Sequence, residues 1–154
     1  MKRLILTAMA VITAVMVSSA AMAATNTMTV SASVTGTCRF SAATSTLAFG
    51  ALDPSSATDG AGSVNVNFWC TRGTAYSMTD DDGLNELAAN ANRMQHAVTA
   101  TEYIPYSISY VAAGTGLGAT SPIALTVTGA ILNADYINAL EGAYADTVVL
   151  TVTP

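Results

Sequence analysis

The residues with the most reactive side chains in this chain are its two cysteines. Cys38 and Cys70 are the only cysteines, so a single pairing is possible, and it would close a loop of 33 residues counted with both ends. An even number of cysteines in an exported chain favours a disulfide, whereas catalytic redox pairs more often lie close together as Cys-x-x-Cys. The sequence therefore predicts a structural disulfide, which stabilises the fold by roughly 3.5 to 4 kcal/mol on the chain-entropy account.

The remaining candidates for metal or acid–base chemistry are isolated. His96 is the only histidine and has no partner at metal-ligand spacing, so a packing or surface role is favoured. Asp80-Asp81-Asp82-Gly83 with Glu86 lacks the alternate-residue spacing of an EF-hand, so a solvated turn is favoured over a calcium loop. The sequence contains no nucleophile elbow and no phosphate-binding glycine loop that opens a helix. We therefore expect no enzymatic activity, no metal and no cofactor.

The first residues predict export. Met1-Lys2-Arg3 is a basic start, residues 4–17 are apolar, and Ala21-Met22-Ala23 offers small residues at both positions that a signal peptidase recognises. No later stretch approaches the roughly 18 to 20 apolar residues of a transmembrane helix. We predict a signal peptide over residues 1–23, a mature chain of 131 residues with one domain, passage through the periplasm, and no membrane insertion.

The charge of the chain disfavours two classes of partner. After removal of the predicted signal peptide, Arg39, Arg72 and Arg93 stand against ten acidic residues, which gives a net charge of −7. Three scattered arginines cannot form the basic stripe that nucleic acid or an anionic membrane surface requires. The small and β-branched residues that dominate the composition suit strands and a surface that contacts other proteins.

After Cys38 the chain is expected to form short strands separated by turns. In residues 63–70, Val64, Val66, Phe68 and Cys70 share one face, which we expect to point into a core. The other predicted strands are residues 47–50, 75–79, 104–110, 123–127 and 144–153; residues 113–118 are predicted to be a glycine-rich turn, and residues 84–98 an irregular connection or weak hairpin. Short strands at this spacing are typical of an all-β sandwich.

Residues 28–34, which precede the first cysteine, show strict alternation. Met28, Val30, Ala32 and Val34 alternate with Thr29, Ser31 and Ser33. This period of two predicts an extended strand with one apolar face. Periodicity alone leaves two alternatives open, which are an ordinary first strand of the chain's own sandwich and a strand that inserts into a neighbouring subunit.

Several motifs, taken in order, resemble the spore coat protein U family, which includes the pilins of archaic, Csu-type chaperone-usher pili. The motifs are Cys38, Leu47-Ala48-Phe49-Gly50, Val64-Asn65-Val66, Cys70-Thr71-Arg72-Gly73-Thr74-Ala75-Tyr76, Arg93-Met94, Pro105-Tyr106-Ser107-Ile108 and Gly142-Ala143-Tyr144-Ala145-Asp146-Thr147-Val148. The closing Gly-x-Tyr-x-Asp-Thr run and the Cys-Thr-x-Gly run are the most specific of them.

The resemblance implies an incomplete immunoglobulin-like β-sandwich that lacks its last strand. It implies a hydrophobic acceptor groove along the C-terminal strand, with Val148, Leu150 and Val152 facing inward. A periplasmic chaperone would fill this groove first, and the N-terminal extension of another subunit would replace it at an outer-membrane usher, by donor-strand complementation. The extension would be residues 24–36, with Met28, Val30, Ala32 and Val34 as the donor row, and the sandwich domain would be residues 37–154.

The function expected on this basis is that of a structural, non-catalytic subunit of a surface fibre that serves adhesion and biofilm formation. Its partners would be identical or related subunits, the chaperone and the usher, and an isolated subunit with an uncovered sheet edge should aggregate or be poorly stable. The alternatives are a monomeric secreted sandwich that binds carbohydrate or a surface through Trp69 or tyrosines, a spore coat structural protein, and a small secreted hydrolase centred on His96.

Overall fold

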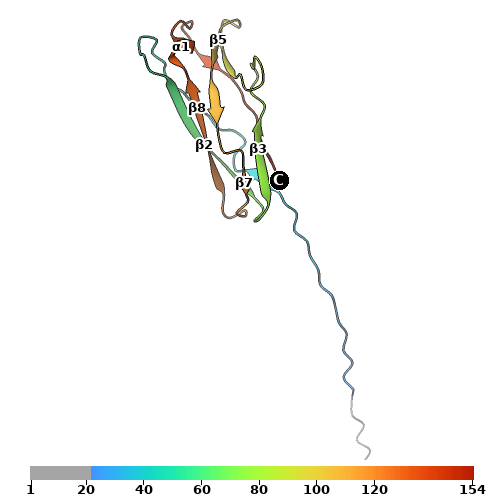
Figure 1. Ribbon diagram of the computed structural model, residues 1–154. Coiled ribbons are helices and arrows are strands. Elements are labelled where there is room, and N and C mark those ends of the chain that lie inside the picture. Colours follow the sequence, from blue (N-terminus) through green and yellow to red (C-terminus); the bar gives the residue numbers. More distant parts are fainter. Residues whose placement is uncertain (1–21) are drawn as a thin grey trace, which may run out of the picture. The chain divides into compact units, whose positions relative to one another are not determined.

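The longest runs of alternating apolar and polar residues become the two longest strands. In the computed structural model, which describes residues 22–154, these are β2 (Gly60–Cys70) and β8 (Ile123–Ile131). They pair antiparallel, with Val66 opposite Leu125, and lie side by side in Figure 1. The predicted facing is confirmed, because the apolar residues of both strands point to one side and are mostly buried, while the residues between them are mostly exposed.

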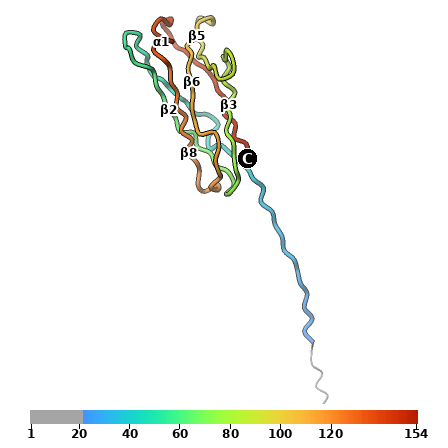
Figure 2. Tube along the Cα trace, viewed as in Figure 1, coloured from blue at the N-terminus to red at the C-terminus, as the bar shows by residue number. Residues whose placement is uncertain are grey.

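Residues 34–154 form one unit of three antiparallel sheets, whose trace is drawn in Figure 2. The four-stranded sheet has the order β1 (Cys38–Phe40), β2, β8, β6 (Ser107–Ser109). One three-stranded sheet has the order β10 (Leu150–Thr153), β3 (Ala75–Asp80), β7 (Ala113–Thr115). The other three-stranded sheet has the order β5 (Tyr103–Pro105), β4 (Arg93–His96), β9 (Tyr144–Ala145). The one helix in the described residues is α1 (Asn133–Tyr136), a single turn.

Two apolar clusters join the sheets into two layers. The larger cluster packs Phe68 and Leu125 of the four-stranded sheet against Met78 of β3. The smaller cluster packs Ile131, at the end of β8, against Ile104 of β5 and Tyr136 of α1. The prediction of an all-β sandwich is therefore confirmed. Between residues 22 and 154, no helix has the length and apolar character needed to cross a bilayer.

The prediction of a turn over residues 113–118 is wrong in part, because β7 occupies the first half of this segment. β7 pairs with β3 and places Gly114 opposite Tyr76. A Cβ atom at Gly114 would lie 2.5 Å from the Tyr76 hydroxyl oxygen, so the tyrosine side chain needs a glycine beneath it. All three residues of β7 are exposed, so no apolar alternation marks this strand in the sequence.

The predicted strand over residues 104–110 is divided in two. β5 ends at Pro105 and β6 begins at Ser107, and the two strands belong to different sheets. At the break, the backbone N–H of Tyr106 donates to the Asn92 carbonyl oxygen at 3.0 Å, which continues the β4–β5 register by one pair, and from Ser107 on the chain pairs with β8. The alternation of exposed and half-buried residues continues across the break, so the sequence predicts where the side chains face but not that the strand changes sheet.

Residues 47–50 are predicted as a strand but have no regular secondary structure. Leu47 and Phe49 still pack against the clusters, and both lie over Gly129 of β8, where a Cβ atom would come within 2.7 Å of each side chain. The prediction for residues 84–98 is confirmed, since turns are followed by β4, which forms a hairpin with β5.

Candidate functional site

The C-terminal strand β10 lies at the edge of its sheet. It pairs with β3, with Val152 opposite Met78, and with no other strand of residues 22–154. Leu150 and Val152 pack against the larger core cluster, and Val148, just before the strand, is also half-buried. β10 therefore presents a row of unpaired backbone groups beside half-buried apolar side chains, a combination that readily accepts another strand.

A second edge strand, β1, lies next to β10. β1 pairs with β2 and with no other strand in the described part of the chain, and it contacts β10 across the two layers. Phe40 of β1 is half-buried against Phe68, with the ring centroids 6.1 Å apart. The two layers thus both end in an edge strand, paired on one side only, on this side of the sandwich. We name β1 and β10 the open edges.

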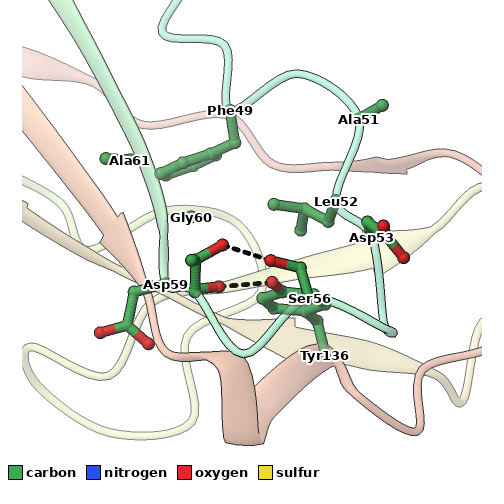
Figure 3. A pocket seen from close by; sticks show the side chains of 10 residues that line it. Phe49, Ala51, Leu52, Asp53, Ser56, Asp59, Gly60, Ala61 and Tyr136 are labelled. Carbon is green, nitrogen blue, oxygen red and sulfur yellow. Dashed lines mark hydrogen bonds between the residues drawn. The ribbon is translucent and has the colours of Figure 1, made fainter.

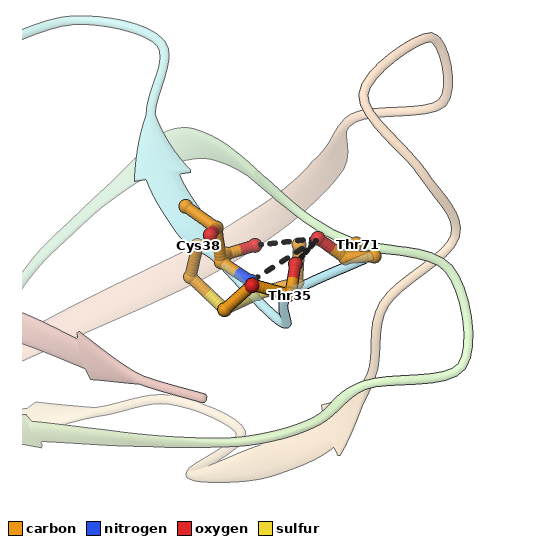
Figure 4. Close-up of a disulfide and its surroundings, with 5 residues drawn as sticks. Thr35, Cys38 and Thr71 are labelled. Atoms are coloured by element: carbon orange, nitrogen blue, oxygen red, sulfur yellow. Dashed lines mark hydrogen bonds between the residues drawn. A yellow bond between two sulfur atoms is a disulfide. The ribbon is translucent and has the colours of Figure 1, made fainter. Parts of the chain in front are cut away.

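The predicted disulfide is confirmed, and it holds one of the open edges in place. Cys38 and Cys70 are bonded and lie directly opposite one another in the β1–β2 ladder, and Cys70 is completely buried. Figure 4 shows Thr35 and Thr71 beside the disulfide, joined by hydrogen bonds. Since β1 is only three residues long, this covalent bond is its strongest attachment to the rest of the sheet.

The predicted donor row lies in and next to a segment without regular secondary structure. Residues 22–33 form no helix and no strand, and Met28 and Val30 are 80% and 81% exposed. Ala32 is also exposed, and Val34, at the start of the sandwich unit, is 84% exposed. None of the four side chains belongs to either core cluster.

The backbone between β9 and β10 is held by two carboxylates. Asp81 Oδ1 accepts hydrogen bonds from the N–H groups of Val149 at 2.8 Å and Gly83 at 3.1 Å. Asp146 Oδ1 accepts a hydrogen bond from the N–H of Leu84 at 3.1 Å. The bond from Val149 is the main cause that lowers the pKa of the Asp81 carboxyl. The two carboxylates interrupt the predicted strand over residues 144–153 and fix the point where β10 begins.

Two tyrosines extend this network toward β5 and β6. The Tyr106 hydroxyl donates to Asp146 Oδ2 at 2.7 Å, and the Tyr110 hydroxyl donates to Asp80 Oδ2. Burial, reinforced by these bonds to carboxylates, raises the pKa of both tyrosine hydroxyls. The prediction of a solvated acidic turn is therefore wrong in part, because Asp80 and Asp81 are structural acceptors. No cluster of histidine, cysteine and acidic side chains in residues 22–154 is arranged to hold a metal ion.

Gly142 and Tyr144, the first two specified residues of the Gly-x-Tyr-x-Asp-Thr motif, pack around His96. His96 is buried, its Nδ1 accepts the N–H of Thr99 at 2.8 Å, and its Nε2 lies 3.1 Å from the carbonyl oxygen of Glu141. Tyr144 packs edge-on against the imidazole at 4.9 Å, and a Cβ atom at Gly142 would lie 2.2 Å from Nε2. The predicted packing role of His96 is thereby confirmed.

A small cavity of about 220 Å³ lies at the α1 end of the sandwich and is shown in Figure 3. Its polar groups bond to one another, since the Tyr136 hydroxyl donates to the Thr58 carbonyl oxygen at 2.6 Å and the hydroxyls of Ser56 and Thr58 lie 2.6 Å apart. The carboxylates of Asp53 and Asp59 point away from each other in Figure 3. These contacts close the loop before β2 onto α1, and the acidic groups do not converge on a common point.

Sequence reasoning missed three residues that shape this region, which are Asp81, Asp146 and Thr71. Asp146 belongs to the Gly-x-Tyr-x-Asp-Thr motif and Thr71 to the Cys-Thr-x-Gly motif. The motifs therefore include both residues but do not show which backbone groups they bind. The hydrogen-bond partner of Asp81 is 68 residues away, and local periodicity contains no information on such a contact. Trp69, proposed as a binding side chain, is half-buried and lies opposite Arg39 in the β1–β2 ladder.

These observations define a class of protein, an all-β domain with an unpaired, apolar-backed sheet edge and an exposed alternating N-terminal segment. The sequence matches the Spore Coat Protein U domain family over residues 24–151, so the chain belongs to that family, and the predicted membership is confirmed. No curated protein sequence matches the chain.

One solved structure with some similarity is a complex from Acinetobacter baumannii. It is described as a CsuC-CsuE chaperone-tip adhesion subunit pre-assembly complex from archaic chaperone-usher Csu pili. The two chains are 18% identical with a TM-score of 0.49, over 77% of this chain and 40% of that chain. This chain therefore spans less than half the length of that protein.

Proposed function

We propose that the protein is a structural subunit of a surface fibre and that successive copies join by donor-strand complementation. In this proposal Met28, Val30, Ala32 and Val34 of one copy form a strand that pairs beside β10 of another copy. Their side chains cover the apolar surface next to Val148, Leu150 and Val152. Family membership supports the proposal, since the Spore Coat Protein U domain extends from residue 24, ahead of this row.

The observation that carries the proposal is that one chain contains both halves of a strand-pairing site. The open edge β10 has unpaired backbone groups beside Leu150 and Val152, and the donor row presents apolar side chains that no core cluster uses. Burial of each larger side chain of the row contributes on the order of 1.5 to 3 kcal/mol, and ladder hydrogen bonds fix the register. Both sets of exposed groups are covered when two copies join.

The same chemistry defines the transient partners. An unpaired apolar-backed edge favours aggregation, so a subunit on its way to the fibre needs a periplasmic chaperone that covers β10 until another subunit replaces it. An outer-membrane usher would be the place of exchange, and the predicted signal peptide over residues 1–23 would direct the chain there; all but its last two residues lie outside the described part. Adhesion and biofilm formation would be the tasks of the assembled fibre.

The proposal predicts an assembly that resists detergent. Co-expression of the full chain with its chaperone and usher should give a ladder of multimers that survives SDS and collapses to monomer on heating, because the joints are strand ladders with buried side chains. Gel electrophoresis of a cell-surface extract with and without boiling measures this. Recovery of a well-behaved, highly stable monomer from the mature chain expressed alone would contradict the proposal.

A further inference from the structure

One side chain, that of Thr71, bonds to the backbone at the point where the donor row meets the sandwich. Thr71 Oγ1 accepts a hydrogen bond from the N–H of Thr37 at 3.1 Å and lies 3.3 Å from the carbonyl oxygen of Thr35, to which it can donate its proton. The N–H of Thr71 donates to the carbonyl oxygen of Thr37 at 2.9 Å. A single residue thus binds the backbone on both sides of Gly36.

Packing and a covalent bond hold the same short segment. A Cβ atom at Gly36 would lie 3.0 Å from Thr74 Oγ1 and 3.1 Å from Thr74 Cγ2, so the backbone here rests directly on the Thr74 side chain. Cys38, two residues further on, is bonded to Cys70, the neighbour of Thr71 (Figure 4). Residues 35–38 are therefore fixed to the β2–β3 turn by hydrogen bonds, contact and a disulfide.

The donor row ends where this fixed segment begins. Val34 is the last apolar residue of the row and is 84% exposed, whereas Thr35 already contacts Thr71. No residue lies between them that could act as a flexible linker. A chain with free linker residues would let two joined domains reorient, and a chain without them transmits the orientation of one domain to the next.

Building on the fibre function proposed above, we infer that Thr71 is a positioning residue that stiffens the joint between successive copies of this chain. The donor row inserted in one copy is continuous with residues 35–37 of its own sandwich, and Thr71 fixes the direction in which the row leaves. The angle between neighbouring subunits is then set by these hydrogen bonds and not by free rotation about the backbone at Thr35 and Gly36.

The test compares two substitutions at position 71 in fibres assembled with chaperone and usher. Thr71→Val keeps the β-branched shape and removes the hydroxyl, whereas Thr71→Ser keeps the hydroxyl and serves as the matched control. We expect the persistence length of Thr71→Val fibres in electron micrographs to fall at least about threefold, as for a joint that gains flexible residues. Thr71→Ser fibres should be as stiff as wild-type fibres.

A second variant covers the case in which Thr71→Val impairs folding. Insertion of Gly-Ser between Val34 and Thr35 leaves every contact of Thr71 in place and adds slack, so it should lower the persistence length in the same way. Mass spectrometry of the disulfide and recovery of the chaperone complex report folding of each variant. These two readouts should match wild type for the insertion.

The outcomes separate this inference from the proposed function. If wild-type chain forms fibres and the insertion variant is as stiff as wild type, the positioning role of Thr71 is wrong while the fibre function stands. Stiffness lost in Thr71→Val and in Thr71→Ser alike would also overturn it, because the hydroxyl would then not be the cause. If wild-type chain forms no fibre at all, both the proposed function and this inference are wrong.

Discussion

Val30→Asp should abolish fibre formation while the subunit still folds and binds its chaperone. Val30 belongs to no core cluster, and in the proposed function it lies outside the subunit's own sandwich, so the charge stays in water in the free subunit. In the proposed joint the same carboxylate would be buried without a partner, which costs far more than the roughly 1.5 to 3 kcal/mol of lost apolar burial. Co-expression with chaperone and usher, followed by recovery of the chaperone complex and of fibres, measures both effects.

The matched control for this experiment is Ser31→Asp. It adds the same charge one residue away, on the face of the segment that alternation turns from the apolar row. We expect Ser31→Asp to retain fibres, because its carboxylate can stay in water. Loss of the chaperone complex in Val30→Asp would mean that residue 30 is part of the subunit's own core, and the donor assignment would then have to be abandoned.

Removal of the disulfide should have the largest effect on the stability of the subunit itself. The double substitution Cys38→Ala with Cys70→Ala should lower the free energy of unfolding by roughly 3.5 to 4 kcal/mol, because the unfolded chain regains the entropy of an open loop. Urea unfolding of the mature chain with a second copy of residues 24–36 linked behind Pro154 to cover β10, followed by the fluorescence of Trp69, measures this. Trp69 is the only tryptophan and lies next to Cys70, so it reports on the β1–β2 ladder.

Chemical reduction of the wild-type chain is the control for the double substitution. It breaks the same bond without removing any side-chain atoms, so both treatments should lower the urea concentration at the midpoint of unfolding by similar amounts. A loss below about 1 kcal/mol would show that β1 is held mainly by its ladder and packing, and the account of the disulfide as its strongest attachment would be wrong.

The sequence predicts the parts of this fold in which local pattern and burial agree. β2 and β8 are long and have one face in the core, so their alternation is unambiguous. β7 is exposed on all three residues, and it pairs with β3, whose Tyr76 side chain lies over Gly114, a contact that no local pattern reveals. The strand is therefore missed for a physical reason, since tertiary contact and not periodicity defines it.

The breaks in the predicted strands have a similar cause. The segment before β10 is held by Asp81 and Asp146, which bond to backbone groups 68 and 62 residues away along the chain, respectively. Such contacts arise only once the sandwich has formed. The sequence therefore predicts that Val148, Leu150 and Val152 share one face, but it predicts one continuous strand over residues 144–153 where the structure has β9 and β10. That β10 is an edge strand was expected from the family resemblance and not from periodicity, because pairing depends on the order of strands in the sheet.

In the proposed fibre, the donor row of one copy pairs with β10 of another copy. Fibres assembled from an equal mixture of ¹⁵N-labelled and ¹³C-labelled chains allow solid-state NMR to detect contacts between copies only. The account predicts ¹⁵N–¹³C contacts between residues 28–34 of one copy and residues 150–153 of another. Contacts between these two segments that occur in uniformly double-labelled fibres and are absent from the mixed fibres would place the row in its own subunit and contradict the claim.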